Sequence, residues 1–302
     1  MSTDAPAIVT EKLTKRFGDF TAVDALDLTI ARGEVVGFIG PNGAGKSTAI
    51  RMLCGLLRPT AGRALVAGYD VARQPDSVRA HIGYMSQKFS LYADLSVIEN
   101  LNFFAGLYRV PRAELRERTQ EAIHMAGLDG QEGALVRDLA GGWKQRLALG
   151  CAILHRPPVL FLDEPTSGVE PEARRRFWEL INRLASGGVT ILVSTHYMDE
   201  AEYCNRIALI NAGRLVAIGS PGELRRRELG GDLYELDSAA PGAALAKLHA
   251  TPGVIDAAIF GDKLHVLLSP SAIDPATLDG APRRITPSLE DVFVQLVSRR
   301  RP

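Results

Sequence analysis

The feature that most narrows the possible folds is a glycine-rich loop, Gly40-Pro41-Asn42-Gly43-Ala44-Gly45-Lys46-Ser47. An apolar run of strand length, Val35 to Ile39, leads into it, and apolar residues at helical spacing follow it from Ser47 to Leu57. Glycines let consecutive backbone N–H groups converge on a phosphate, and the start of a helix adds partial positive charge. The pattern G-x-x-x-x-G-K-S after a strand therefore predicts a phosphate-binding loop, in which Lys46 reaches the β- and γ-phosphates and Ser47 ligates Mg²⁺.

A second buried run ends in two carboxylates, Asp163 and Glu164, directly after Val159-Leu160-Phe161-Leu162. At a strand end Asp163 can hold Mg²⁺ through its water shell, and Glu164 can polarise an attacking water as a general base. Acidic pairs at strand ends are often only solvated. The phosphate loop upstream favours a nucleotide bound with Mg²⁺, and the loop alone leaves kinases, GTPases, helicases and transport ATPases open.

The rest of the chain indicates an α/β protein. A hairpin is expected over Arg63 to Val71, and a helical block over about residues 91–155, opened by the capping box Ser96 and Glu99. Strands return afterwards, and a long amphipathic helix, Pro171 to Ala185, forms a βαβ crossover between Val159–Leu162 and Val189–Ser194. Past Gly219 the pattern predicts a small α/β appendage without a recognisable catalytic cluster.

Two further segments resemble the ABC ATPase family. They are Leu139-Ala140-Gly141-Gly142-Trp143-Lys144-Gln145-Arg146, at the position of the signature, and Ser194-Thr195-His196, at the position of the switch histidine. The resemblance covers about residues 7–222 in the family's motif order. It implies a P-loop NTPase (RecA-like) core with an antiparallel β subdomain and an inserted helical subdomain at about 91–155. The expected domains are residues 1–225 and a small C-terminal α/β domain, 226–302.

The same resemblance implies roles for individual residues. Phe17 would stack on adenine with Val23 beside it, Gln87 would touch Mg²⁺, and His196 would sense the γ-phosphate. Ser167 to Glu170 would form the D-loop at a dimer interface, and Asp163 would complete the metal site with Ser47 and Gln87. The nucleotide-binding set is Phe17, Val23, Gly40, Pro41, Asn42, Gly43, Ala44, Gly45, Lys46, Ser47, Thr48, Ala140, Gly141 and Gly142, and the catalytic set is Glu164, His196, Lys46 and Gln87. Alternatives are a core position for Phe17, a surface loop for Gln87 and a hydrogen-bonded strand-end histidine for His196.

The signature departs from the family pattern Leu-Ser-Gly-Gly-Gln, because Ala140 and Trp143 replace its serine and glutamine, and Glu170 replaces the D-loop aspartate. In this family the signature of one subunit caps the ATP held by the other. A lost serine hydroxyl costs a hydrogen bond to a charged group, about 1.5–3 kcal/mol, or roughly a ten- to hundredfold weakening. A homodimer in the ATP-bound state that hydrolyses ATP slowly is favoured. The alternative is a heterodimer with a subunit that carries the consensus signature.

The segments His196 to Glu202 and Pro287 to Phe293 look like the ABC-2 type branch, which includes multidrug and antibiotic-resistance exporters. That likeness implies a separate permease gripping the helical subdomain near Gln87, Phe89 and Tyr92, with the appendage as a dimerisation or regulatory element. The apolar runs fall short of the roughly 20 residues that span a bilayer, so we expect a cytoplasmic chain held on the inner face of the membrane by its partner.

The composition argues against a nucleic-acid-binding protein. Lys plus Arg equals Asp plus Glu at 35 each, which lacks the basic footprint of a nucleic-acid protein. Cys54, Cys151 and Cys204 match no zinc or disulfide spacing and are expected to be small buried residues. Two alternatives of function stay open: a soluble ABC ATPase outside transport, and a regulatory subunit that binds ATP without hydrolysing it.

Overall fold

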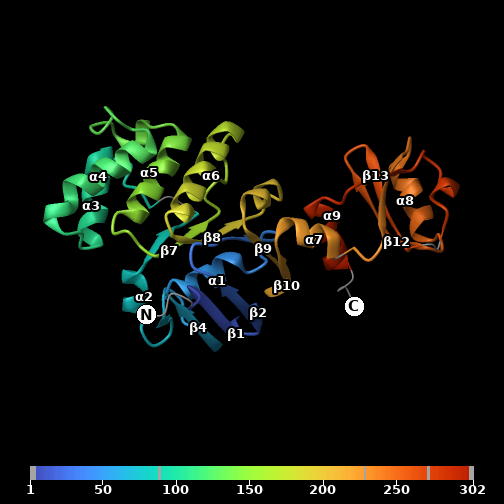
Figure 1. Cartoon of the computed structure of the whole chain (residues 1–302), viewed down its shortest axis with the longest axis horizontal. Coiled ribbons are helices and arrows are strands. Elements are labelled where there is room, and N and C mark those ends of the chain that lie inside the picture. The colour runs from blue at the N-terminus through green and yellow to red at the C-terminus, as the bar shows by residue number, and fades with distance from the viewer. Residues whose placement is uncertain (1–4, 88–89, 228, 271–272, 299–302) are drawn as a thin grey trace. The chain divides into compact units, whose positions relative to one another are not determined.

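The chain folds into two compact units, Met1–Leu215 and Val216–Pro302. A computed structural model describes residues 5–87, 90–227, 229–270 and 273–298 (Figure 1). The domain boundary expected between residues 225 and 226 falls inside helix α7 (Pro221–Arg227) and stays a prediction. Within the described ranges, no helix is both long enough and apolar enough to span a bilayer.

A six-stranded sheet with the order β10-β9-β3-β8-β7-β6 lies mainly in the first unit, and its edge strand β10 continues past Leu215. Its strands are β3 (Val35–Ile39), β6 (Ile82–Met85), β7 (Val159–Asp163), β8 (Thr190–Thr195), β9 (Arg206–Asn211) and β10 (Arg214–Gly219). The strands from β9 to β6 pair in parallel, and every residue of β3, β7 and β8 is buried, which explains the continuous apolar runs. Helix α6 (Pro171–Ser186) confirms the expected crossover between β7 and β8.

An antiparallel sheet with the order β2-β1-β4-β5 also belongs to this unit. Its strands are β1 (Ile8–Phe17), β2 (Phe20–Ile30), β4 (Ala61–Val66) and β5 (Tyr69–Asp70). The hairpin predicted around Gly68 is confirmed by β4 and β5, whose turn has positive φ at Ala67 and Gly68. The strand expected at Val35 to Ile39 is confirmed as β3, and β2, which precedes it in the chain, lies in the other sheet.

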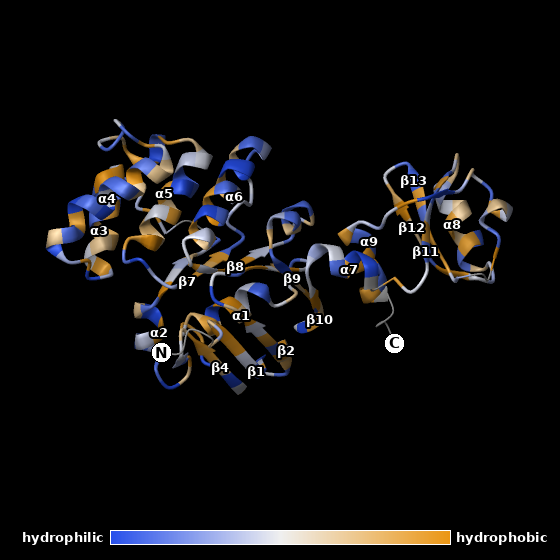
Figure 2. Ribbon diagram, viewed as in Figure 1, coloured by the Kyte–Doolittle hydropathy of each residue, from blue (hydrophilic) through white to orange (hydrophobic). Residues whose placement is uncertain are grey.

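The helical block consists of α3 (Val97–Leu107), α4 (Arg112–Ala126) and α5 (Gly141–Ile153), which share one apolar core that includes Leu101, Ile123 and Leu147. The predicted capping box is confirmed, because Ser96 N donates to Glu99 Oε2 at 2.7 Å and Glu99 N donates to Ser96 Oγ at 3.3 Å. Strands β7 and β8 are largely apolar, whereas α4 and α6 alternate between apolar and hydrophilic residues (Figure 2).

Helix α1 (Lys46–Leu53) is shorter than predicted. The apolar spacing suggested a helix that continues to Leu57, but Cys54 is its C-cap and Gly55 follows with φ at 67°. A glycine in the left-handed region directly after the last turn ends a helix, and the apolar residues beyond it belong to a loop. A short helix, α2 (Pro75–Ala80), then precedes β6.

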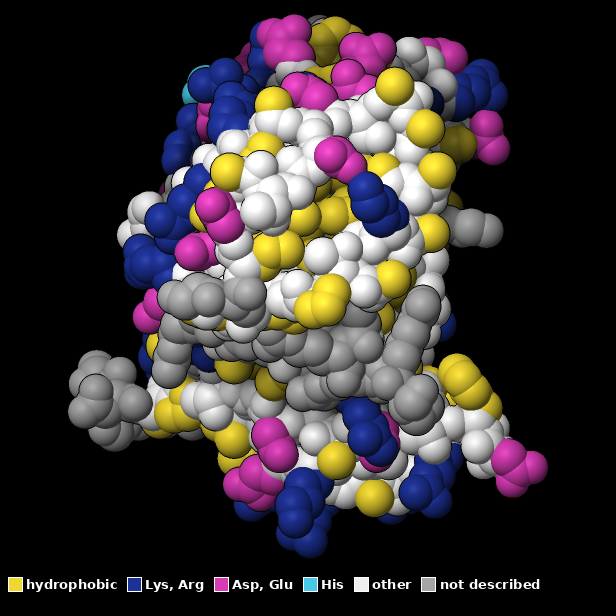
Figure 3. Space-filling model, turned by 90° about the vertical axis from the view of Figure 1, so that its right-hand side faces the viewer, with side chains coloured by type: hydrophobic (Ala, Val, Ile, Leu, Met, Phe, Trp, Pro, Cys, Tyr) yellow, Lys and Arg dark blue, Asp and Glu magenta, His cyan; other side chains and the backbone are white. Residues whose placement is uncertain are grey.

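The second unit is built on an antiparallel sheet with the order β12-β13-β11-β14. Besides α7, its elements are β11 (Asp232–Asp237), α8 (Pro241–His249), β12 (Val254–Phe260), β13 (Lys263–Leu268), β14 (Arg283–Arg284) and α9 (Leu289–Ser298). Asp291 joins α9 to the sheet, because its Oδ1 lies 2.6 Å from His265 Nδ1. The face drawn in Figure 3 carries apolar side chains in its middle and charges of both signs along its margins.

Candidate active site

The phosphate loop joins the end of β3 to the start of α1, and close packing requires two of its glycines. A Cβ on Gly40 would lie 2.1 Å from Ile210 O, and one on Gly45 would lie 2.3 Å from Ala22 O. Gly45 also has φ at 102°, where an L side chain is strained. The neighbouring strands therefore hold the loop against the sheet, with the N-terminus of α1 behind it.

Lys46 is buried at the base of this loop, with 4% of its surface exposed. Its Nζ donates to Gly40 O at 2.8 Å and to Pro41 O at 3.1 Å, and it lies 3.4 Å from Glu164 Oε1. Because a buried ammonium needs partners, these three oxygens hold the lysine in the loop. Phosphate oxygens bound there would compete for the same hydrogens.

Asp163 lies at the carboxyl end of β7, where two hydroxyls converge on one of its oxygens. Asp163 Oδ1 accepts from Ser47 Oγ at 2.9 Å and from Ser194 Oγ at 2.7 Å. Sequence reasoning missed this role of Ser194, although Ser194 pairs directly with Asp163 in the β7–β8 register. No cluster of three or more His, Cys, Asp or Glu side chains suited to a metal occurs among the described residues. One hydroxyl and one carboxylate fit Mg²⁺, which keeps water and phosphate oxygens as its other ligands.

Glu164 is the point where the catalytic candidates meet. Its Oε2 accepts from Gln87 Nε2 at 3.0 Å and lies 3.5 Å from His196 Nδ1, while Lys46 approaches Oε1. Its backbone is in the left-handed region, with φ at 49°, and its N–H donates to Ser194 at both O (3.1 Å) and Oγ (3.0 Å). Such a conformation is costly for a residue with a Cβ and is maintained here by the bonds to Ser194.

Gln87 and His196 thus both approach the Glu164 carboxylate, and Gln87 does so from an exposed position. The amide of Gln87 is bonded to Glu164, so its predicted contact with Mg²⁺ stays a prediction. His196 Nδ1 is buried and has no hydrogen-bond partner among the described residues, which disfavours the alternative of a hydrogen-bonded strand-end histidine.

The adenine and signature residues lie farther from this centre. Phe17 is 49% exposed, which excludes the core alternative, and Lys15 Nζ lies 5.1 Å from its ring centroid. Val23 is buried beside Gly45, and Thr48 lies half-buried in the first turn of α1. Their roles toward adenine and phosphate stay predictions.

The signature segment opens helix α5. Ala140 is its exposed N-cap and supplies no side-chain bond to the helix start. Within the part of the chain that the structure describes, no hydrogen bond or ion pair joins Ala140, Gly141 or Gly142 to Lys46 or Glu164. Gln145, which sequence reasoning missed, is fully buried and its Nε2 donates to Pro165 O. This bond ties the signature helix to the residue after Glu164.

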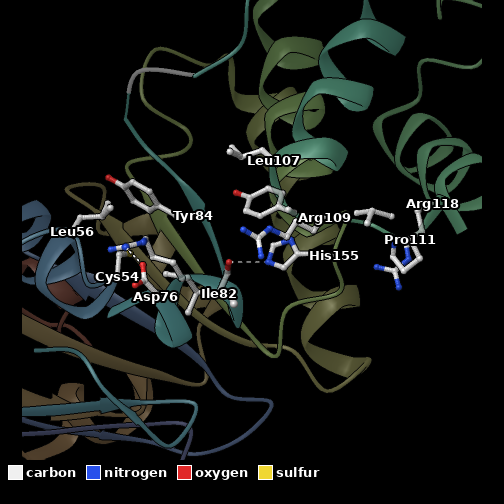
Figure 4. A pocket seen from close by; sticks show the side chains of 14 residues that line it. Cys54, Leu56, Asp76, Ile82, Tyr84, Leu107, Arg109, Pro111, Arg118 and His155 are labelled. Carbon is white, nitrogen blue, oxygen red and sulfur yellow. Dashed lines mark hydrogen bonds and ion pairs between the residues drawn. The ribbon is translucent and has the colours of Figure 1, made fainter. Parts of the chain in front are cut away.

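A groove of about 710 Å³ lies apart from these residues (Figure 4). Its core side is formed by residues such as Cys54, Leu56 and Tyr84, and its helical side by residues such as Leu107 and His155. Burial, aided by nearby Asp163, raises the pKa of Tyr84 to about 12 and raises the pKa of the Cys54 thiol, so both groups stay protonated. Burial lowers the pKa of His155, whose Nε2 lies 2.9 Å from Ile82 O.

Comparison with known proteins agrees with this geometry. The family model described as "ABC transporter" matches residues 23–167, and an "AAA domain, putative AbiEii toxin, Type IV TA system" model matches residues 142–198. The daunorubicin resistance ATP-binding protein DrrA3 of Streptomyces coeruleorubidus is 38% identical over 306 residues, covering 96% of this chain and 95% of that protein. The chain belongs to the ABC transporter family. It is similar to the family's ATP-binding proteins along nearly its whole length.

Two further members of the ABC transporter family show how much of this chain is similar to known proteins. A probable multidrug ABC transporter ATP-binding protein of Escherichia coli (strain K12) is 50% identical over 218 residues, or 72% of this chain. This chain spans only 38% of the length of that relative. An ATP-binding cassette solved as a dimer in a post-hydrolysis state, bound to ADP and Pi, has a TM-score of 0.64 at 27% identity, covering 70% of this chain and 98% of that one. The expected fold of a P-loop ATPase cassette is confirmed.

Proposed function

We propose that the protein is the ATP-hydrolysing subunit of an ABC-2 type exporter for drugs, antibiotics or other small molecules. One observation carries the proposal: the Glu164 carboxylate contacts Lys46 and Gln87 and lies close to His196. The residue before it in the chain, Asp163, accepts a hydrogen bond from Ser47 of the phosphate loop. This is the set of groups that hydrolysis of a bound nucleotide requires.

The positions of these side chains suggest how ATP would be bound and hydrolysed. The loop amides and Lys46 bind the phosphates of ATP, and Phe17 presents its exposed ring to the adenine. Ser47 and Asp163 would hold Mg²⁺, which supplies charge neutralisation on the β- and γ-phosphates. Glu164 would take the proton of the attacking water, and His196, 3.5 Å from its carboxylate, would sense the γ-phosphate.

A second copy of the chain would complete each site. The signature segment makes no bond to its own Glu164 or Lys46 among the described residues, and the related cassette was solved as a dimer. A helix that begins with Gly141 and Gly142 can direct backbone N–H groups and its dipole to the γ-phosphate of the partner. We propose a homodimer that ATP closes; Ala140 favours, as the second candidate, a heterodimer with a consensus subunit.

Export requires a separate membrane permease, and the groove is the surface we assign to it. The groove lies between the core and the helices, next to β6, the strand that leads to Gln87. On α3 and the loop before it, Tyr92 and Phe103 are 47% and 44% exposed and in edge-to-face contact with each other, so they offer a second apolar surface to the permease. Phe89, also expected at this surface, lies outside the described residues. The protein would then work at the cytoplasmic face of the membrane. Relatives named as a multidrug transporter protein, a daunorubicin resistance protein and a Nod factor export protein support the substrate class.

The proposal is tested by measuring phosphate release and the oligomeric state of the purified chain with ATP. We expect slow hydrolysis that requires Mg²⁺, falls to background with EDTA, and accompanies an ATP-dependent dimer in light scattering. Co-expression with the permease is expected to move the protein to the membrane fraction. Absence of hydrolysis both alone and with the permease would refute an ATPase role.

The alanine at the signature gives a gain-of-function prediction. Ala140→Ser restores a side-chain oxygen at the N-cap of α5, which stabilises the folded chain by about 1 kcal/mol. The same hydroxyl can donate to the γ-phosphate across the dimer, so the ATP concentration that gives half-maximal dimerisation is expected to fall roughly tenfold or more. Both are measured on the purified protein, by thermal unfolding and by light scattering.

The matched control is Ala240→Ser, because Ala240 is the N-cap of α8 in the second unit and also lacks a side-chain cap bond. This control is expected to raise stability and leave ATP-driven dimerisation unchanged. Equal dimerisation in the parent and Ala140→Ser would show that the signature position does not face the nucleotide.

A further inference from the structure

Two segments supply the reacting groups of the site, and Arg174 contacts both. The first, residues 163–170, follows from β7 and carries Glu164; the second, residues 194–200, follows from β8 and carries His196. Arg174 lies in the first turn of α6, directly after the first segment, and is 18% exposed at its side chain. Its guanidinium donates from Nη2 to Val169 O at 3.5 Å.

On the second segment, Arg174 meets a buried carboxylate. Glu200 is 0% exposed; its Oε1 lies 3.4 Å from Arg174 Nε and accepts a bond from Thr166 Oγ1. Glu200 Oε2 is buried and has no hydrogen-bond partner among the described residues. Because an unpaired buried charge is strongly unfavourable, Glu200 holds the arginine in place. Asp199 adds a weaker attraction, with Oδ2 at 3.6 Å from Nη1.

The face of the guanidinium reaches the residue next to His196. Arg174 Cζ lies 4.1 Å from the centroid of the Tyr197 ring, within the range of a cation–π interaction. The Tyr197 ring in turn packs on the His196 ring, with centroids 4.1 Å apart and planes at 36°. The nitrogens of one guanidinium therefore pair with Glu200 and bond to Val169 O, and its flat face stacks on Tyr197.

We propose that Arg174 is a positioning residue that sets the separation of Glu164 and His196 by clamping their two segments together. The inference rests on the proposed ATPase function and deepens it. Arg174 acts through Tyr197 on His196, and through Glu200 and Thr166 on the segment that begins with Glu164. A lysine could pair with Glu200 but presents no planar face to Tyr197 while doing so.

The test separates turnover from nucleotide binding in three variants. In Tyr197→Phe the ring remains, so kcat for phosphate release is expected to stay within about twofold of the parent. In Tyr197→Leu and Arg174→Lys a misplaced His196 is expected to lower kcat roughly tenfold or more, with the Kd for ATP unchanged. The matched control is Arg175→Lys, at an exposed neighbour whose side chain pairs with Glu179, and it is expected to behave as the parent.

Thermal unfolding of each variant and Glu164→Gln complete the experiment. Full kcat in Tyr197→Leu and Arg174→Lys, or a loss of kcat matched by equal losses of ATP affinity and thermal stability, would overturn the clamp. Loss of kcat in Tyr197→Phe as well would overturn it too, because the hydroxyl would then be the group that matters. If the parent chain releases no phosphate above background, the proposed ATPase function fails rather than the clamp alone. A Glu164→Gln variant that is as fast as the parent would overturn only the role of Glu164 as the base.

Discussion

Glu164→Gln is expected to lower kcat for ATP hydrolysis by about 10²–10⁴-fold while ATP binding persists. The carboxylate is held by Lys46 and Gln87, and the backbone N–H of Glu164 is held by Ser194, so an amide of the same shape can occupy its place. An amide cannot accept the proton of the attacking water. The variant is therefore expected to accumulate as an ATP-bound dimer, measured by light scattering beside phosphate release.

Glu172→Gln is the matched control, because Glu172 is an exposed glutamate in the first turn of α6 whose pairing with Arg176 has no link to the site. It is expected to hydrolyse ATP at the parent rate. Retained turnover in Glu164→Gln would show that another group activates the water.

Lys46→Ala is expected to abolish hydrolysis through a loss of binding. The ammonium is buried and held by Gly40 O, Pro41 O and Glu164, so it already lies in the loop that we propose binds the phosphates. A hydrogen bond to a charged group contributes about 1.5–3 kcal/mol, which corresponds to roughly a ten- to hundredfold higher Kd for ATP. Fluorescent-nucleotide titration measures this Kd.

Lys247→Ala provides the control, since Lys247 is an exposed lysine of the second unit that pairs with Asp279. It is expected to leave both Kd and kcat unchanged. The two site variants then differ in kind: Glu164→Gln binds ATP without hydrolysing it, whereas Lys46→Ala loses both. An unchanged Kd in Lys46→Ala would place the phosphates elsewhere.

The central sheet and most of the site could be predicted because short-range signals specify them. Strands buried on both faces need continuous apolar runs, and these marked β3, β7 and β8. The phosphate loop and the Asp163–Glu164 pair stand at the ends of such strands. Parallel strands bring these ends to one edge of the sheet, so Lys46 and Glu164 meet although they are distant in sequence.

Other features could not be predicted, since their signals are irregular or depend on tertiary packing. Strand β1 was missed because shifts of register interrupt its pairing with β2, and Lys12 within it has φ at 46°. Ser194 and Gln145 are ordinary polar residues until the fold sets one against Asp163 and the other against Pro165 O. Arg174 belongs to a run of three arginines, a pattern typical of a solvent-exposed helix face. Only its pairing with the buried Glu200, which the fold creates, separates Arg174 from the other two.

Helix α1 begins at the candidate active site and ends at the groove. Its first residue is Lys46, and its C-cap, Cys54, lines the groove together with Leu56. A helix about 12 Å long thus connects the proposed phosphate site to the wall of the groove. Any ligand of the groove that favours one position of this helix must change the affinity for ATP, and ATP must change the affinity of that ligand by the same factor. A groove ligand that favours one position of α1 is therefore expected to change nucleotide affinity without touching the nucleotide.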